Sequence, residues 1–252
     1  MKLIRAVVAP MFCIFIAVPA FAAEIKVLTA GAMKSVLVAL APEFEKQSGH
    51  HLTIANDTAG GLAKRIGDGE AFDVAIITPA AIGALEKAGK IASKSAVDIA
   101  KVGIGVAVKA GAPKPDIATV AAFKDALLAA KSVAYIDPKA GGSSGIYFDK
   151  WLETVGLADA VRAKAKLKQG GYVAELVANG EADIAVHQIS EILPVSGAIL
   201  VGPLPPEIQN YTTYTAAVSA GAADAAAATA LLTYLRGDAA KAVLKSKGIE
   251  VP

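Results

Sequence analysis

The sequence is almost without cysteine, because its one thiol, Cys13, lies within the first 22 residues. Residues 23–252 therefore exclude disulfides, zinc-thiolate sites and cysteine nucleophiles. They also lack a long hydrophobic run, and a membrane-spanning helix needs about 20 consecutive apolar residues. We expect no membrane insertion of this part of the chain.

The N-terminal segment has the features of a signal peptide. Lys2 and Arg5 precede an apolar run that ends near Val18, and Ala20-Phe21-Ala22 supplies the small-x-small pattern of a cleavage site. We predict that residues 1–22 are removed and that the mature chain is periplasmic.

The mature chain also has no excess of positive or negative charge. The 25 lysines and arginines include Lys2 and Arg5, so the basic residues of the mature chain equal the 23 aspartates and glutamates. This balance argues against nucleic acid or an anionic membrane surface as a partner. Aromatic residues make up only 6% of the chain, and the hydrophobic fraction of 54% comes largely from alanine, as in alanine-rich helices packed on a sheet.

Familiar catalytic motifs are absent. Gly142-Ser143-Ser144-Gly145 is not the Gly-x-Ser-x-Gly turn of hydrolases, and neither a phosphate-binding loop nor a dinucleotide fingerprint occurs. No His, Asp or Glu cluster has metal-ligand spacing. We therefore expect no cofactor and no metal.

The sequence does contain short β-branched runs that alternate with longer alanine-rich helical patterns. Such alternation predicts an α/β fold with parallel sheets covered by helices on both faces. Several predicted strands end in small polar residues, at 29–32, 56–61 and 137–145. In open α/β sheets, ligands bind beyond the carboxyl ends of the strands, so we expect a cleft lined by backbone amides there.

The clearest of these loops contains Ser143 and Ser144 between glycines, directly before an amphipathic stretch. A helix N-terminus with free N–H groups and hydroxyls is a ready anion site, although the same residues also suit an ordinary turn. Gly170-Gly171 and Asn56-Asp57-Thr58 show the same pattern more weakly. Their recurrence at strand ends favours the binding of a small anionic ligand.

His187 is the most informative single side chain. It ends a predicted strand, where it can face the cleft as a hydrogen-bond donor, base or cation; the alternative is a satisfied, partly buried histidine. Glu191 follows four residues later, one helical turn away, and is placed to orient His187 or pair with it.

Several segments together resemble the molybdate-binding (ModA-like) family of periplasmic proteins. They are Ile25–Met33, Ala59–Ile66, Gly69–Ile76, Ile136–Pro138 with Ser144–Tyr147, and Val177–Ile184. The resemblance covers essentially all of the mature chain. It implies a type II periplasmic binding protein with two α/β lobes, a hinge and a ligand cleft between the lobes. It also implies residues 23–104 plus 207–252 for lobe 1 and 105–206 for lobe 2, in a monomer.

The site implied by the resemblance departs from that of molybdate binders. Ala32, next to Gly31, and Ala59 stand where the family has serine ligands, although Thr58 is available beside Ala59. His187 stands where the family has a tyrosine. Loss of hydroxyl donors together with a gained histidine predicts a different, larger anion, because a site built for one oxyanion disfavours analogues that leave buried groups unpaired.

These features leave three functional hypotheses. The first is a binding protein that delivers an organic di- or tricarboxylate to an inner-membrane ABC permease. The second follows from an offshoot of the family, the aconitate isomerases: an enzyme that moves a proton within aconitate. His187 with Glu191 nearby is its candidate base, and Thr58, Ser143 and Ser144 are its candidate donors. The third is binding of molybdate or tungstate.

Overall fold

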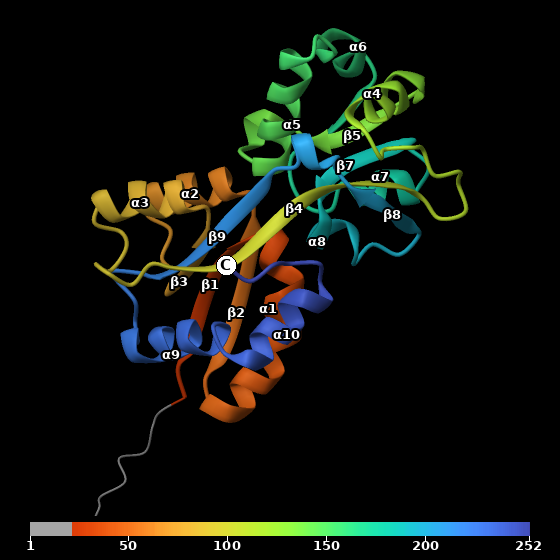
Figure 1. Ribbon diagram of the computed structural model, residues 1–252. Coiled ribbons are helices and arrows are strands. Elements are labelled where there is room, and N and C mark those ends of the chain that lie inside the picture. The colour runs from red at the N-terminus through yellow and green to blue at the C-terminus, as the bar shows by residue number, and fades with distance from the viewer. Residues whose placement is uncertain (1–21) are drawn as a thin grey trace, which may run out of the picture.

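The computed structural model describes residues 22–252, which form two α/β lobes joined by the long strands β4 and β9 (Figure 1). Of the predicted signal peptide, only Ala22 lies within the described residues. Among those residues, no helix is long and apolar enough to cross a membrane.

Lobe 1 contains the chain's first strands and its last helices. Its sheet has the order β2-β1-β3-β9-β4, in which β1 pairs in parallel with β2 and β3, whereas β9 is antiparallel to both β3 and β4. The elements are β1 (Glu24–Ala30), α1 (Gly31–Ser48), β2 (His51–Asp57), α2 (Ala59–Gly67), β3 (Val74–Ile77), α3 (Pro79–Lys87), β4 (Val97–Lys109), β9 (Tyr211–Val218), α9 (Ala225–Leu235) and α10 (Asp238–Ser246).

Lobe 2 is built on the far half of β4. The sheet continues as β4-β7-β5-β6, with β8 on the other side of β4; the β5–β6 and β5–β7 pairs are parallel, and β4 is antiparallel to β7 and β8. The elements are α4 (Val120–Ala129), β5 (Val133–Ile136), α5 (Ser143–Thr154), α6 (Ala158–Arg162), β6 (Ala165–Lys168), α7 (Ala174–Ala178), β7 (Ile184–Gln188), α8 (Ile189–Ile192) and β8 (Ala198–Pro203).

The prediction of parallel sheets is confirmed for β1–β3 and β5–β7 but was wrong for the remaining strands. β4, β8 and β9 are antiparallel to their neighbours, and β4 is a single 13-residue strand that runs through both lobes. A strand of this kind pairs with different partners along its length, which local periodicity does not reveal. Because β4 runs without interruption through residue 104, the predicted lobe boundaries stay a prediction.

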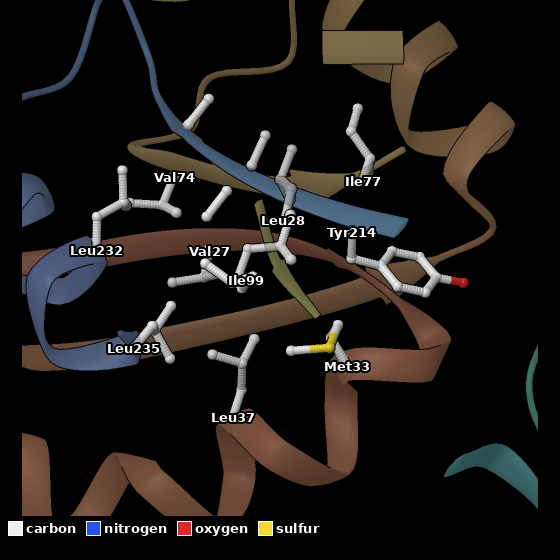
Figure 2. Close-up of a cluster of buried hydrophobic side chains, with 14 of the residues drawn as sticks. Val27, Leu28, Met33, Leu37, Val74, Ile77, Ile99, Tyr214, Leu232 and Leu235 are labelled. Atoms are coloured by element: carbon white, nitrogen blue, oxygen red, sulfur yellow. The ribbon is translucent and has the colours of Figure 1, made fainter. Parts of the chain in front are cut away.

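Each lobe has its own hydrophobic core. One cluster takes its side chains from residues 25–102 and 214–249, and two others take theirs from residues 104–208. In the first cluster, Val27, Leu28 and Leu37 pack between the sheet and the helices (Figure 2). Full burial of a side chain of this kind stabilises the fold by about 2 kcal/mol. These cores hold the strand ends that carry the candidate site.

Candidate functional site

Three helix N-termini converge between the lobes. α1 begins at Gly31 directly after β1, α2 begins at Ala59, and α5 begins at Ser143. They surround a small cavity of about 30 Å³. The residues lining the cavity are Ala30, Gly31, Asp57, Thr58, Ala59, Ile136, Gly142, Ser143, Ser144, Gly171, His187, Gln188, Glu191 and Tyr214. No lysine or arginine is among them, so partial positive charges of helix N-termini, not side-chain cations, favour an anion there.

The lobes touch each other at the rim of this cavity. The Gly60 N–H donates to the Gly141 carbonyl across a 3.0 Å distance, and a Cβ at Gly60 would lie 2.8 Å from the Gly141 Cα. The Thr58 hydroxyl donates to the carbonyl of Ala140. These contacts describe a closed cleft, and a ligand larger than the cavity requires the lobes to separate.

The predicted relation between His187 and Glu191 is present in the structure. His187 lies on β7 and Glu191 on the short helix α8, with 3.5 Å between His187 Nε2 and Glu191 Oε2. Both side chains line the cavity and are buried, at 1% and 7% exposed. His187 Nδ1 has no hydrogen-bond partner in the described part of the chain. A buried unpaired nitrogen of this kind marks a position where a ligand group fits.

Burial makes both members of this pair neutral near pH 7. It raises the pKa of Glu191 to about 8. Burial, with a smaller contribution from the charge of Lys168, lowers the pKa of His187 to about 3. The 3.5 Å contact is therefore not an ion pair. Glu191, with a pKa close to the operating pH, is the better proton acceptor and donor of the two.

This pair predicts how stability depends on pH. From pH 4.5, the usual value for glutamate, to pH 8, the folded state retains a proton on Glu191 that the unfolded state loses, so stability falls as pH rises. His187 has the opposite effect between pH 3 and pH 6.5, because there only the unfolded state binds the proton. The two effects oppose each other between pH 4.5 and 6.5, and only the Glu191 effect continues from 6.5 to 8.

We expect the thermal midpoint to fall between pH 6.5 and 8, and to fall less in Glu191→Gln. If the thermal midpoint fell equally with pH in the unmodified protein and in Glu191→Gln, the prediction would be contradicted.

Most hydroxyls near the cavity already have partners. Thr58 accepts from the Gly61 N–H at 3.0 Å and donates its only proton to Ala140, so that proton is not free for a ligand in the closed form. Ser144 is buried at the start of α5, and its hydroxyl forms no hydrogen bond to another residue that the structure describes. Its hydroxyl is therefore available to an anion.

Gln188 forms a hydrogen bond that fixes the side chain of the other serine, Ser143. Its amide fits its surroundings when the oxygen accepts from the hydroxyls of Ser143 (3.1 Å) and Thr212 (2.9 Å) and the nitrogen donates to the carbonyls of Val102 (3.1 Å) and Gly103 (3.3 Å). The reverse orientation would point the amide oxygen at two carbonyls. Gln188 thereby ties the start of α5 to both strands that connect the lobes.

The structure brings together most of the predicted site residues. Eight of them line the cavity: Gly31, Thr58, Ala59, Ser143, Ser144, Gly171, His187 and Glu191. Ala32 and Gly170 lie outside the lining; the carbonyl of Ala32 instead accepts from the Ser190 hydroxyl at 2.8 Å. Sequence reasoning missed Gln188 and Tyr214. Tyr214 gives no local signal because an aromatic residue within a strand is typical of a core.

Metal ligands are not grouped here. Among the described residues, no three His, Cys, Asp or Glu side chains are placed to hold a metal ion. Amides and hydroxyls that line the cavity can form hydrogen bonds with a ligand, and Glu191 and His187 carry groups that can transfer protons.

The fold and this inter-lobe site define a periplasmic binding protein architecture, and comparison with known proteins agrees. The chain belongs to the bacterial extracellular solute-binding proteins, whose family model matches residues 25–250. It is 36% identical to an aconitate isomerase from Pseudomonas sp. over 233 residues, 90% of this chain and 87% of that protein.

Two further comparisons involve molybdate-binding proteins. The chain is 28% identical over 245 residues to the molybdate-binding protein ModA of Azotobacter vinelandii, with 92% of each chain covered. The solved structure of the A. vinelandii periplasmic molybdate-binding protein superimposes with a TM-score of 0.78 at 23% identity, over 91% of this chain and all of the other. That structural likeness establishes the shared fold.

Proposed function

We propose that this protein is a cofactor-free isomerase of aconitate or a similar unsaturated carboxylate. The observation that carries the proposal is the position of Glu191, a buried carboxyl group with a raised pKa inside a cavity otherwise built for an anion. Glu191, protonated near pH 7, adds no positive charge that would help to capture an oxyanion. It suits an enzyme that must move a proton. The 36% identity to an aconitate isomerase supports the same conclusion.

The reaction is a proton shift along an allylic unit. The ionised Glu191 takes a proton from the CH₂ carbon next to the double bond, so a C–H bond breaks and an O–H bond forms. The electron pair spreads over the double bond and its carboxylate. Glu191 then returns the proton to the far end of the allylic unit, the double bond moves, and the enzyme regains its initial state.

Other groups hold the substrate during this transfer. The N–H groups at the starts of α1 and α5 and the hydroxyl of Ser144 bind its carboxylates, and His187 Nδ1 supplies or accepts one hydrogen bond. In this scheme His187 positions the substrate and Glu191, and Glu191 is the base. This assignment changes the prediction that His187 is the base, because the pKa of His187 is lowered to about 3 and that of Glu191 is raised to about 8.

The direct test is turnover. Purified protein incubated with trans-aconitate is expected to yield cis-aconitate without added metal or cofactor, as followed by chromatography. The protein boiled before incubation is the control. No conversion above that control at high protein concentration would overturn the proposal.

Carriage of an organic di- or tricarboxylate to an ABC permease is the second candidate, favoured by membership of the solute-binding family. We expected this role first; the similarity to an aconitate isomerase favours the enzyme. In either role we propose a periplasmic location and the lobe division 23–104 plus 207–252 and 105–206.

Ligand binding can be predicted for either role. Citrate and the two aconitates are expected to raise the thermal midpoint, because ligands that bind only the folded state stabilise it. Molybdate and sulfate are expected to have little effect, because Ala32 and Ala59 offer no hydroxyl where molybdate binders have serine ligands. Stabilisation by molybdate alone would contradict the organic-acid assignment.

A further inference from the structure

Tyr214 faces the cavity from the lobe opposite Glu191. It lies on β9, with its ring packed in the lobe 1 core, and Figure 2 shows its hydroxyl pointing away from the aliphatic side chains. The residue is 2% exposed and lines the cavity together with Glu191 of α8. Its hydroxyl is 3.5 Å from Ser143 Oγ, at the outer limit of a hydrogen bond. Since a buried tyrosine hydroxyl normally has a good partner, this one is poorly satisfied.

The hydroxyl proton of Ser143 already has an acceptor within the protein. A hydroxyl carries one proton, and that of Ser143 is donated to the amide oxygen of Gln188. Ser143 therefore meets Tyr214 as an acceptor and has no proton to give to an anion. Of these two hydroxyls, only that of Tyr214 has a proton to offer a ligand.

We infer that Tyr214 is a further catalytic residue, whose hydroxyl donates a hydrogen bond to the substrate carboxylate on which negative charge develops. The inference rests on the proposed isomerase function. When Glu191 removes the allylic proton, the electron pair moves toward that carboxylate, and a donor already in place stabilises it without itself reacting. Tyr214 keeps its proton throughout the cycle. Burial and the nearby Glu191 raise the pKa of Tyr214, so the phenol remains a donor at neutral pH.

Placing the two groups on different lobes has a direct consequence. Glu191 belongs to the helix after β7, whereas Tyr214 belongs to a strand of the lobe 1 sheet. The two groups reach the same substrate only when the lobes come together around it, further apart than in the closed cleft of about 30 Å³. Proton transfer is therefore restricted to the state in which the substrate is enclosed.

Tyr214→Phe tests the inference because it removes one oxygen and keeps the packed ring. With trans-aconitate we expect kcat to fall about 30-fold, as for the loss of one hydrogen bond to a charged group, and KM to change less than threefold. The pH profile of the remaining activity should keep its midpoint, because Glu191 remains the base. Tyr211→Phe, on the same strand but exposed, is the matched control and should retain full activity.

The outcomes separate this inference from the proposed function. An unmodified protein without turnover overturns the isomerase proposal, and this inference with it. An active protein whose Tyr214→Phe variant has unchanged kcat overturns the role of Tyr214 alone. A lowered thermal midpoint together with a shifted pH profile would show that Tyr214 only supports the fold and Glu191. If Tyr214→Phe does not fold, replacement of Tyr214 by 3,5-difluorotyrosine keeps the ring and the hydroxyl but makes the hydroxyl a stronger donor; a kcat equal to that of the unmodified enzyme would then count against the inference.

Discussion

Glu191→Gln is expected to lower kcat for aconitate isomerisation by about 1,000-fold or more. The amide has nearly the same shape as the carboxyl group but cannot take a proton from carbon. General acid–base catalysis contributes about 10²- to 10⁴-fold, and here the base acts in both halves of the reaction. The unmodified enzyme should also gain activity as pH rises toward 8, because ionisation of Glu191 increases over this interval.

The variant should still fold and bind substrate. A neutral amide replaces a carboxyl group that is itself mostly neutral at pH 7, so thermal midpoint and aconitate affinity should change little. Glu86→Gln, on the exposed face of α3, is the matched control and should be fully active. Turnover within tenfold of the unmodified enzyme would remove Glu191 from the chemistry.

Gly31→Ala is expected to lower kcat/KM by about 100-fold while leaving the protein folded. A Cβ built at Gly31 lies 2.3 Å from Glu191 Oε1, so the carboxyl group must move. The obstructing atom is the end of a flexible side chain, and it can yield without displacing the backbone. A shift of about 1 Å in a catalytic group can cost about 100-fold in rate.

A glycine elsewhere provides the comparison. A Cβ at Gly83, in the middle of α3, meets no atom within 4 Å. Gly83→Ala should therefore keep full activity and gain up to about 1 kcal/mol of stability from helix propensity. If Gly31→Ala were as active as Gly83→Ala, the carboxyl position would not matter for catalysis. Kinetics and thermal denaturation of both variants decide the point.

Much of the fold could be predicted from the chain because its signals are local. Strand ends followed by small polar residues mark the cleft loops, and the four-residue spacing of His187 and Glu191 brings them together once a helix begins after β7. The family resemblance then indicates two lobes, and that fold is confirmed by the structural comparison.

Other features depend on contacts between distant segments. Gln188 matters because two crossing strands present Thr212, Val102 and Gly103 to its amide, and these residues are not its neighbours in sequence. From the sequence, Tyr214 looks like an ordinary aromatic residue of a core. Its position at the cavity is known only once the fold brings the two lobes together. Likewise, the hydroxyl of Thr58 is attractive as an anion donor until Ala140 of the other lobe accepts its proton.

The contact between Gly60 and Gly141 has a thermodynamic consequence for the working cycle. Two bare backbones meet there through a hydrogen bond, and the Thr58 hydroxyl adds a second one to the Ala140 carbonyl beside them. A hydrogen bond of this kind contributes about 1 kcal/mol net, so the rim adds little resistance to reopening. A substrate needs only a few kcal/mol of preference for the closed state to shift the population toward it. Because the free-energy difference between the closed and open states is small, product can also leave. We therefore do not expect reopening of the cleft to limit turnover.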